Sequence, residues 1–148
     1  MNFHYLETIY QKHKVDVLFG KWITLKEIEP LIKSLHSNFE ITNIGTSEEN
    51  RPIYSLKIGS GSKKIMIWSQ MHGNESTGTK AMFDLLQCFN KVSDMHFNDL
   101  LKACTLLFVP MLNPDGAIRY TRENANHIDL NRDAVDKEAV ESRILRTV

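Results

Sequence analysis

The stretch SQMHGNESTGTK, residues 69–80, places His72 and Glu75 three residues apart. A histidine ring nitrogen and a carboxylate oxygen are both zinc ligands in proteins. The pair stands where an apolar run ends and small, polar residues begin. Both side chains can reach one metal ion if a strand ends at His72 and a helix begins near Glu75, where the helix N-terminus also favours a negative charge.

The pair has a second interpretation. The pattern H-x-x-E also arises by chance, and taken alone it is more often a surface histidine with a solvated glutamate in the first turn of a helix. Gly73 and Gly78, beside the pair, predict room for a metal ion and a substrate to approach the backbone. The pattern by itself therefore leaves both interpretations open.

A second polar stretch, NPDGAIRYTRENANHIDLNRD, spans residues 113–133. Its first four residues are of the types that form turns. Arg119, Arg122 and Arg132 follow, interleaved with asparagines. Arginine offers a planar fork that suits carboxylates, so one interpretation is a site for an anionic substrate group. A solvated loop whose arginines pair with local acids fits the composition equally well.

The elements that position these stretches follow from hydrophobic periodicity. Residues 24–35 predict a helix, with Thr24 and Glu27 as a capping box and Pro30 either opening the main helix or kinking it. Further helices are expected at 76–90 and 136–148, and strands at 39–45, 52–59, 64–70 and 103–110.

The strands at 64–70 and 103–110 are apolar enough to be buried on both faces of a sheet. This order of elements predicts the α/β class, with a mixed, mostly parallel sheet and helices on both faces. Ligands in such folds bind beyond the carboxyl ends of strands. Each of the two polar stretches follows a strand at that end, so we expect them to be neighbours in space.

Composition narrows the classes of function. The 148 residues suit one domain, and 18 basic residues balance 18 acidic ones. No basic run, membrane-length apolar run or signal peptide is evident, so we expect no nucleic-acid partner, no membrane partner and a cytoplasmic protein. Cys88 and Cys104 stand in apolar company and are interpreted as small buried hydrophobic residues.

The two polar stretches together resemble a known family. HGNES followed by NPDG and then TRENANHIDLNRD is similar to the zinc carboxypeptidases, the M14 metallopeptidases. The preceding segment, IGTSEENRPIYSLKIGSGSKKIMIWSQ, is similar to that family's lead-in. The resemblance covers about residues 40–133, and the joint presence and order of both motifs is far more specific than H-x-x-E alone. It implies a zinc carboxypeptidase-like fold.

The resemblance also implies site roles. His72 and Glu75 would be two of the three protein ligands of one zinc ion. Asp129 would hold the other ring nitrogen of His72. Arg122 would polarise the scissile carbonyl and stabilise the oxyanion, and Arg119 fits the family spacing less well.

The implied substrate is a peptide or acyl-amino acid with a free carboxylate. Asn131 and Arg132 would hold that terminal carboxylate. The implied reaction is hydrolytic removal of a C-terminal residue by a zinc-activated water. Related alternatives are an N-acyl amino acid deacylase of the same fold, or a non-catalytic domain that binds peptide C-termini through Asn131 and Arg132.

The sequence departs from the family pattern in two ways. His127 stands where a glycine is expected in many relatives. The family's third zinc ligand and general base lie on later segments, so we expect neither in this chain. We therefore expect the N-terminal portion of a single domain, with a helical lead-in at 1–38 and an α/β sheet region at 39–148. We also expect that the chain alone is inactive and that an exposed sheet edge allows self-association.

Overall fold

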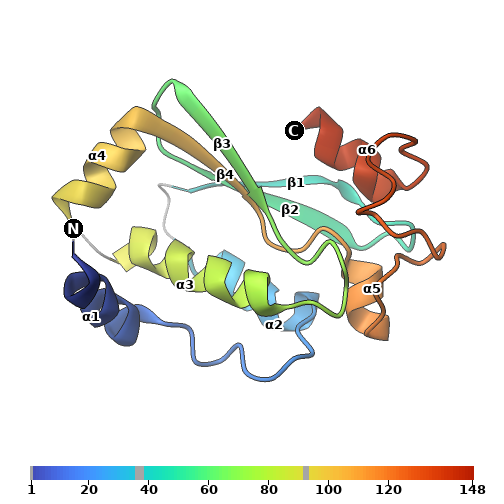
Figure 1. Ribbon diagram of the computed structural model, residues 1–148, viewed down its shortest axis with the longest axis horizontal. Helices are drawn as coiled ribbons and strands as arrows, with labels where there is room; N and C mark the ends of the chain where they lie inside the picture. The colour runs from blue at the N-terminus through green and yellow to red at the C-terminus, as the bar shows by residue number, and fades with distance from the viewer. Residues whose placement is uncertain (1, 36–38, 92–93) are drawn as a thin grey trace.

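The computed structural model describes residues 2–35, 39–91 and 94–148. Its centre is a four-stranded sheet with the order β1-β2-β4-β3, seen in Figure 1. The strands are β1 (Glu40–Thr46), β2 (Pro52–Ile58), β3 (Lys63–Trp68) and β4 (Cys104–Val109).

Helices cover both faces of this sheet. The helices are α1 (Phe3–His13), α2 (Leu25–Lys33), α3 (Thr77–Lys91), α4 (Met95–Ala103), α5 (Pro114–Arg119) and α6 (Val140–Thr147). Helices α1, α2 and α3 lie on one side of the sheet and α6 on the other (Figure 1). Each face has its own apolar cluster. The larger joins α1, α2 and α3 to β2 and β4, and the smaller joins α6 to buried Ile53 and Val109.

The predicted α/β class with a mixed sheet is confirmed, but the expectation of mostly parallel pairing is wrong for the described sheet. Strands β3 and β4 are parallel, whereas β1–β2 and β2–β4 are antiparallel. Antiparallel pairs therefore outnumber parallel pairs among the described residues. Strands β1 and β2 are antiparallel because residues 47–51, which connect them, are far too few for the crossover that parallel strands need.

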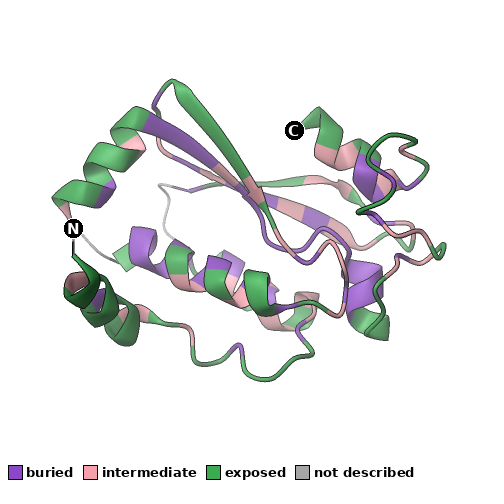
Figure 2. Cartoon of the chain, in the orientation of Figure 1, coloured by how far each residue is buried: buried purple, intermediate pink, exposed green. Residues whose placement is uncertain are grey.

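The prediction that the strand near residues 64–70 is buried on both faces is wrong. Side chains of Ile65, Met66 and Trp68 are 42%, 37% and 43% exposed. Strand β3 lies at one end of the strand order, so β4 is its one partner in the described sheet. The prediction holds for β4, where Phe108 and Val109 are fully buried. Figure 2 shows this contrast between the two strands.

The helices agree in part with those that the sequence predicts. The capping box of Thr24 and Glu27 is present, and α2 runs through Pro30. The expected turn at NPDG is instead the start of α5, where the Asn113 side chain accepts a hydrogen bond from the Gly116 N–H and proline occupies the first turn. The polar segment before β4 forms α4, which the periodicity did not predict.

One predicted boundary differs in the structure, and another adjoins residues that the structure does not describe. The C-terminal helix begins at Val140 rather than at residue 136. The predicted boundary between residues 38 and 39 adjoins residues 36–38, which lie outside the described residues. In the described ranges, no helix has both the length and the apolar character that crossing a bilayer requires.

Candidate active site

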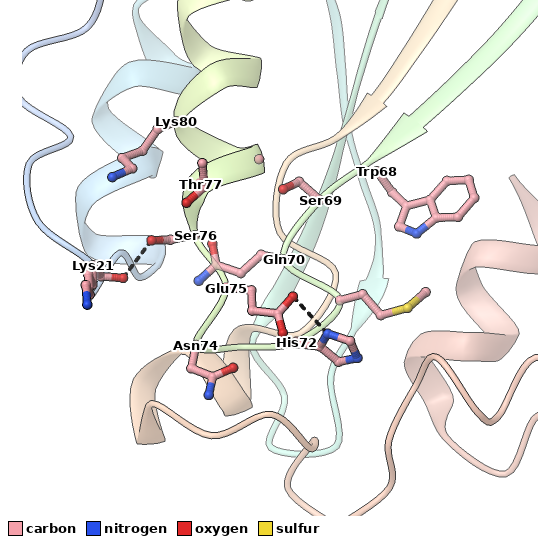
Figure 3. Close-up of a pocket in the computed structure, with 12 residues that line it drawn as sticks. Lys21, Trp68, Ser69, Gln70, His72, Asn74, Glu75, Ser76, Thr77 and Lys80 are labelled. Atoms are coloured by element: carbon pink, nitrogen blue, oxygen red, sulfur yellow. Dashed lines mark hydrogen bonds and ion pairs between the residues drawn. The ribbon is translucent and has the colours of Figure 1, made fainter.

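His72 and Glu75 lie on the connection between β3 and α3, as their spacing predicts. The Nδ1 atom of His72 is 3.1 Å from Oε2 of Glu75 (Figure 3). Two ligands on adjacent corners of a tetrahedral zinc site are about 3.4 Å apart when each bond is about 2.1 Å. The two atoms therefore already stand at nearly the separation that a shared zinc ion requires.

Asp129 holds the opposite side of the His72 ring. Its Oδ1 lies 3.2 Å from Nε2 of His72 and accepts the Asn131 backbone N–H at 3.0 Å. The proximity of Asp129 to His72 that the sequence predicts is thus present. A carboxylate on one ring nitrogen orients the imidazole and leaves the other nitrogen to face a metal.

The carboxyl of Asp129 is stabilised in its charged form. Burial raises its pKa, but hydrogen bonds from Arg122, the Asn131 N–H and the His72 ring outweigh that effect and leave the pKa lowered. This environment therefore favours ionised Asp129. The ionised carboxylate can accept a hydrogen bond from a protonated ring nitrogen of His72.

Arg122 bridges the two polar stretches. Its Nε donates to Oδ2 of Asp129 at 2.9 Å, and its Nη1 lies 3.3 Å from Oε1 of Glu75. Arg119 points elsewhere, because it pairs with Glu49 and donates to the Ala125 carbonyl at 3.2 Å. The tertiary structure therefore selects Arg122 over Arg119 as the arginine beside the His72–Glu75 pair.

The carboxylate-binding candidates are more peripheral. Asn131 and Arg132 are both exposed. Asn131 borders a cavity of about 270 Å³ whose other lining residues include Trp68 and Met71. Among the described residues, no ion pair engages the guanidinium of Arg132, so its fork is open to solvent. Their substrate-binding role stays a prediction.

His127 does not join the pair. Its side chain is 88% exposed and its Nδ1 lies 3.5 Å from Oε2 of Glu123. Its backbone φ is +62°, in the left-handed region where glycine is most comfortable. The glycine expected at this position thus answers a backbone requirement, which His127 meets with some strain.

Several residues that hold the site were missed by sequence reasoning. Buried Gln70 donates from Nε2 to the carbonyls of Ile23 and Gly73, each at 2.8 Å. Its Oε1 accepts the Thr79 hydroxyl at 2.8 Å. The side chain therefore fastens the loop before His72 to α3 and to the segment before α2. Nothing in the local pattern distinguishes this glutamine from a solvated one.

Gly73 has a different reason for being glycine than the sequence suggests. A Cβ at Gly73 would lie 1.9 Å from the Gly116 carbonyl carbon in α5. The missing side chain therefore admits the backbone of α5 rather than a metal or substrate, which corrects the expectation. Asn113 reinforces this contact by donating from Nδ2 to the Met71 carbonyl at 3.2 Å.

The donor set is incomplete within the described ranges. There, no cluster of three or more His, Cys, Asp or Glu side chains is arranged to hold a metal ion. His72 and Glu75 fit zinc in chemistry and separation, as two of the three protein ligands that catalytic zinc sites have. Their fit is therefore that of a partial site.

The pair borders an open cavity of about 510 Å³. Figure 3 shows this cavity between the end of β3 and the first turn of α3. Its lining residues are Lys21, Trp68, Ser69, Gln70, Met71, His72, Asn74, Glu75, Ser76, Thr77, Gly78 and Lys80.

Comparisons with known proteins agree with this geometry. A family model described as "Zinc carboxypeptidase" matches residues 26–142. Carboxypeptidase D of Mus musculus is 28% identical over 113 residues, which are 64% of this chain and 8% of that protein.

Solved structures show the same fold. The metallo-carboxypeptidase from Burkholderia cenocepacia superimposes with a TM-score of 0.76 at 21% identity, covering 82% of this chain and 36% of that one. Carboxypeptidase A from Helicoverpa armigera gives 0.67 at 21% identity, covering 97% of this chain and 48% of that one. The chain thus spans less than half the length of each of these proteins.

Proposed function

Because this chain belongs to the zinc carboxypeptidase family, we propose that its polar edge forms part of a zinc site that hydrolyses the C-terminal bond of a peptide. His72 and Glu75 are the two ligands, and Arg122, Asn131 and Arg132 act on the substrate. The observation that carries the proposal is the 3.1 Å separation of the two ligand atoms, with Asp129 occupying the far ring nitrogen. When bound, zinc supplies a Lewis acid and activates water for attack.

The side chains of this chain have separable tasks. Asp129 fixes the ring plane of His72 so that Nδ1 faces Glu75. Arg122 is anchored to Asp129 through Nε. Its Nη groups can therefore leave Glu75 and donate hydrogen bonds to the oxygen of a scissile carbonyl instead. Donors already aimed at developing charge stabilise it without further reorganisation.

The substrate's free carboxylate is assigned to Asn131 and Arg132. An arginine fork can hold a carboxylate through two parallel hydrogen bonds, which a lysine cannot do. Both residues are exposed and Asn131 borders the smaller cavity, so a peptide terminus can reach them.

The proposal includes the state of the isolated chain. Two protein ligands are fewer than the three that catalytic zinc sites have, and the described residues contain no group of three metal-binding side chains. We therefore expect weak zinc binding by the chain alone and no turnover of a C-terminal peptide substrate. A positioned base is itself worth about 10²- to 10⁴-fold in rate.

Zinc titration tests the metal site. We expect His72→Ala to abolish binding and Asp129→Ala to weaken it by about 10- to 100-fold, because the ring loses its orientation. Asp136→Ala is the matched control, since Asp136 is exposed and forms no ion pair with the described residues. An unchanged affinity in the Asp129 variant would remove that residue from the site.

Peptide binding separates the alternatives. A C-terminal carboxylate should matter to the peptidase and to the non-catalytic binder, whereas zinc dependence is expected of the hydrolases alone. If Arg132→Lys weakens binding of a free-acid peptide no more than that of its amide, Arg132 has no carboxylate role.

A further inference from the structure

The larger cavity has a cationic wall that the proposed chemistry does not use. Lys21 and Lys80 line it together with His72 and Glu75. In Figure 3 the two lysines lie on the side of the cavity away from Trp68, with the His72–Glu75 pair nearer its centre. The cavity therefore extends from the metal-ligand pair to two positive charges.

The structure holds the Lys80 ammonium close to the backbone of Lys21. Lys80 donates from Nζ to the Gly20 carbonyl at 2.9 Å, next to Lys21 in the chain. The Lys21 carbonyl accepts the Ser76 hydroxyl at 2.6 Å, which ties its segment to the start of α3. Contacts from Ser76 and Lys80 therefore secure the backbone that carries Lys21.

Neither ammonium group has an acidic partner among the described residues. Glu75 is the one acidic residue in the cavity lining, and in the proposed site its charge belongs to the metal. An ammonium carries three N–H donors, so Lys80 keeps two after its bond to Gly20. The wall thus offers positive charge and donors to a ligand.

The two cavities set the direction of a bound substrate. They share Trp68 and Met71, so these side chains lie between them. Asn131 borders the smaller cavity, and the His72–Glu75 pair borders the larger. A peptide whose terminal carboxylate sits near Asn131 therefore crosses the metal ligands and continues toward Lys21 and Lys80.

We propose that Lys21 and Lys80 determine specificity by binding a carboxylate side chain, Asp or Glu, on the part of the peptide that precedes the scissile bond. This inference rests on the proposed function for the direction of the peptide. The substrate class is then an acidic peptide with a free C-terminus.

Binding to the chain tests the inference without activity. The probes are acetyl-Glu-Glu-Ala and the isosteric acetyl-Gln-Gln-Ala, titrated at low ionic strength without added metal. We expect the Glu peptide to bind more tightly, by about two- to fivefold for each lysine that it engages. The preference should fall in Lys21→Gln and in Lys80→Gln, disappear in the double variant, and weaken as salt rises.

The control is the double variant Lys33→Gln and Lys102→Gln, which makes the same change in net charge outside the cavity lining. Equal binding of the two peptides, no measurable binding of either, or an equal loss in the control would overturn the inference. Thermal unfolding confirms that each variant is folded.

A third peptide, acetyl-Glu-Glu-Ala-amide, separates the two proposals. If amidation has no effect but the lysine variants abolish the preference for the Glu peptide, the acid-binding role of Lys21 and Lys80 is supported and the carboxylate role of Asn131 and Arg132 is refuted. If amidation weakens binding while the Glu and Gln peptides bind equally, the carboxylate role is supported and the acid-binding role of the two lysines is refuted.

Discussion

Strands β3 and β4 are parallel neighbours with similar apolar sequences, yet they occupy different environments. Six residues of β3 pair in register with six of β4, from Lys63 opposite Cys104 to Trp68 opposite Val109. Five of the six β4 residues are buried, whereas five of the six β3 residues are exposed. Each strand delivers one half of the candidate site from its carboxyl end.

The difference shows that an apolar strand need not be an interior strand. Strand β4 has partners on both sides, whereas β3 ends the described sheet. The loop after β3 is nonetheless held by buried contacts of its own. Its anchors are buried amides and a glycine contact rather than the strand itself. Positioning of the site therefore depends on the loops more than on the edge strand.

The largest expected effect is a difference between β3 and β4 in the free energy of unfolding that one truncated side chain costs. Phe108→Ala in β4 removes a fully buried ring and should lower the free energy of unfolding by about 3–5 kcal/mol. Ile65→Ala in β3 should cost about 1 kcal/mol or less, because Ile65 is 42% exposed. Urea unfolding followed by circular dichroism measures both, and similar losses would show that the edge of β3 is covered in solution.

The second prediction concerns the anchor of the β3 loop. Gly73→Ala places a methyl group 1.9 Å from the α5 backbone, so the helix or the loop must move. We expect a loss of about 3 kcal/mol, at the upper end for overpacking, together with weaker zinc binding. Gly20→Ala is the control, with a positive φ but no atom within 4 Å of its Cβ. Retention of zinc affinity by the Gly73 variant would mean that the contact does not position His72.

The third prediction concerns the anchor of the β4 loop. Fully buried Glu141 accepts from Nδ2 of Asn124 at 3.0 Å, and Asn124 accepts the Asn126 and Ile128 N–H groups at 3.0 Å. This chain of bonds shapes the loop between Arg122 and Asp129. Burial raises the pKa of Glu141, with the Asn124 hydrogen bond acting in the opposite direction.

Because its pKa is raised in the folded state, Glu141 contributes to the free energy of unfolding in a way that depends on pH. This contribution is fully present below the pKa of Glu141 in the unfolded chain. It is lost as pH rises through the folded-state pKa, because Glu141 ionises first in the unfolded chain. Glu141→Gln removes that loss. The stability of the variant relative to the unmodified chain should therefore increase from acid to neutral pH, measured by urea unfolding at each pH. A difference that stays constant with pH would contradict this assignment.

The smallest effect on stability is expected at the free edge, where we propose self-association. Ile65→Lys should change the free energy of unfolding by about 0.5 kcal/mol or less. It should nevertheless reduce dimerisation, because an inserted lysine discourages edge-to-edge strand pairing. Ile41→Lys on β1 is the matched control at the opposite edge, with Ile41 39% exposed. Sedimentation that is unchanged by Ile65→Lys would exclude β3 as the contact.

Much of the site follows from local sequence. The order of apolar strands and helices predicts an α/β sheet, and the carboxyl-end rule brings residues near 72 and 129 together. The resemblance of the paired motifs to the zinc carboxypeptidases supplies the expected role of Arg122. The Thr24 capping box and the helix after Glu75 are likewise local, because they depend on residues within one or two turns. Local chemistry also predicts that NPDG redirects the chain, although it forms the start of α5 rather than an isolated turn.

Other features were decided only by tertiary structure. The burial of β3 depends on which strands lie beside it, and hydrophobic pattern carries no information about strand order. The glycine requirement at Gly73 comes from Gly116, a residue distant in sequence. The contact between Arg119 and Glu49, which lies 70 residues earlier in the chain, likewise has no signal in the local sequence. The sequence by itself determined which residues can do the chemistry, and long-range packing decided which of them meet, because contacts between distant segments leave no periodic signal along the chain.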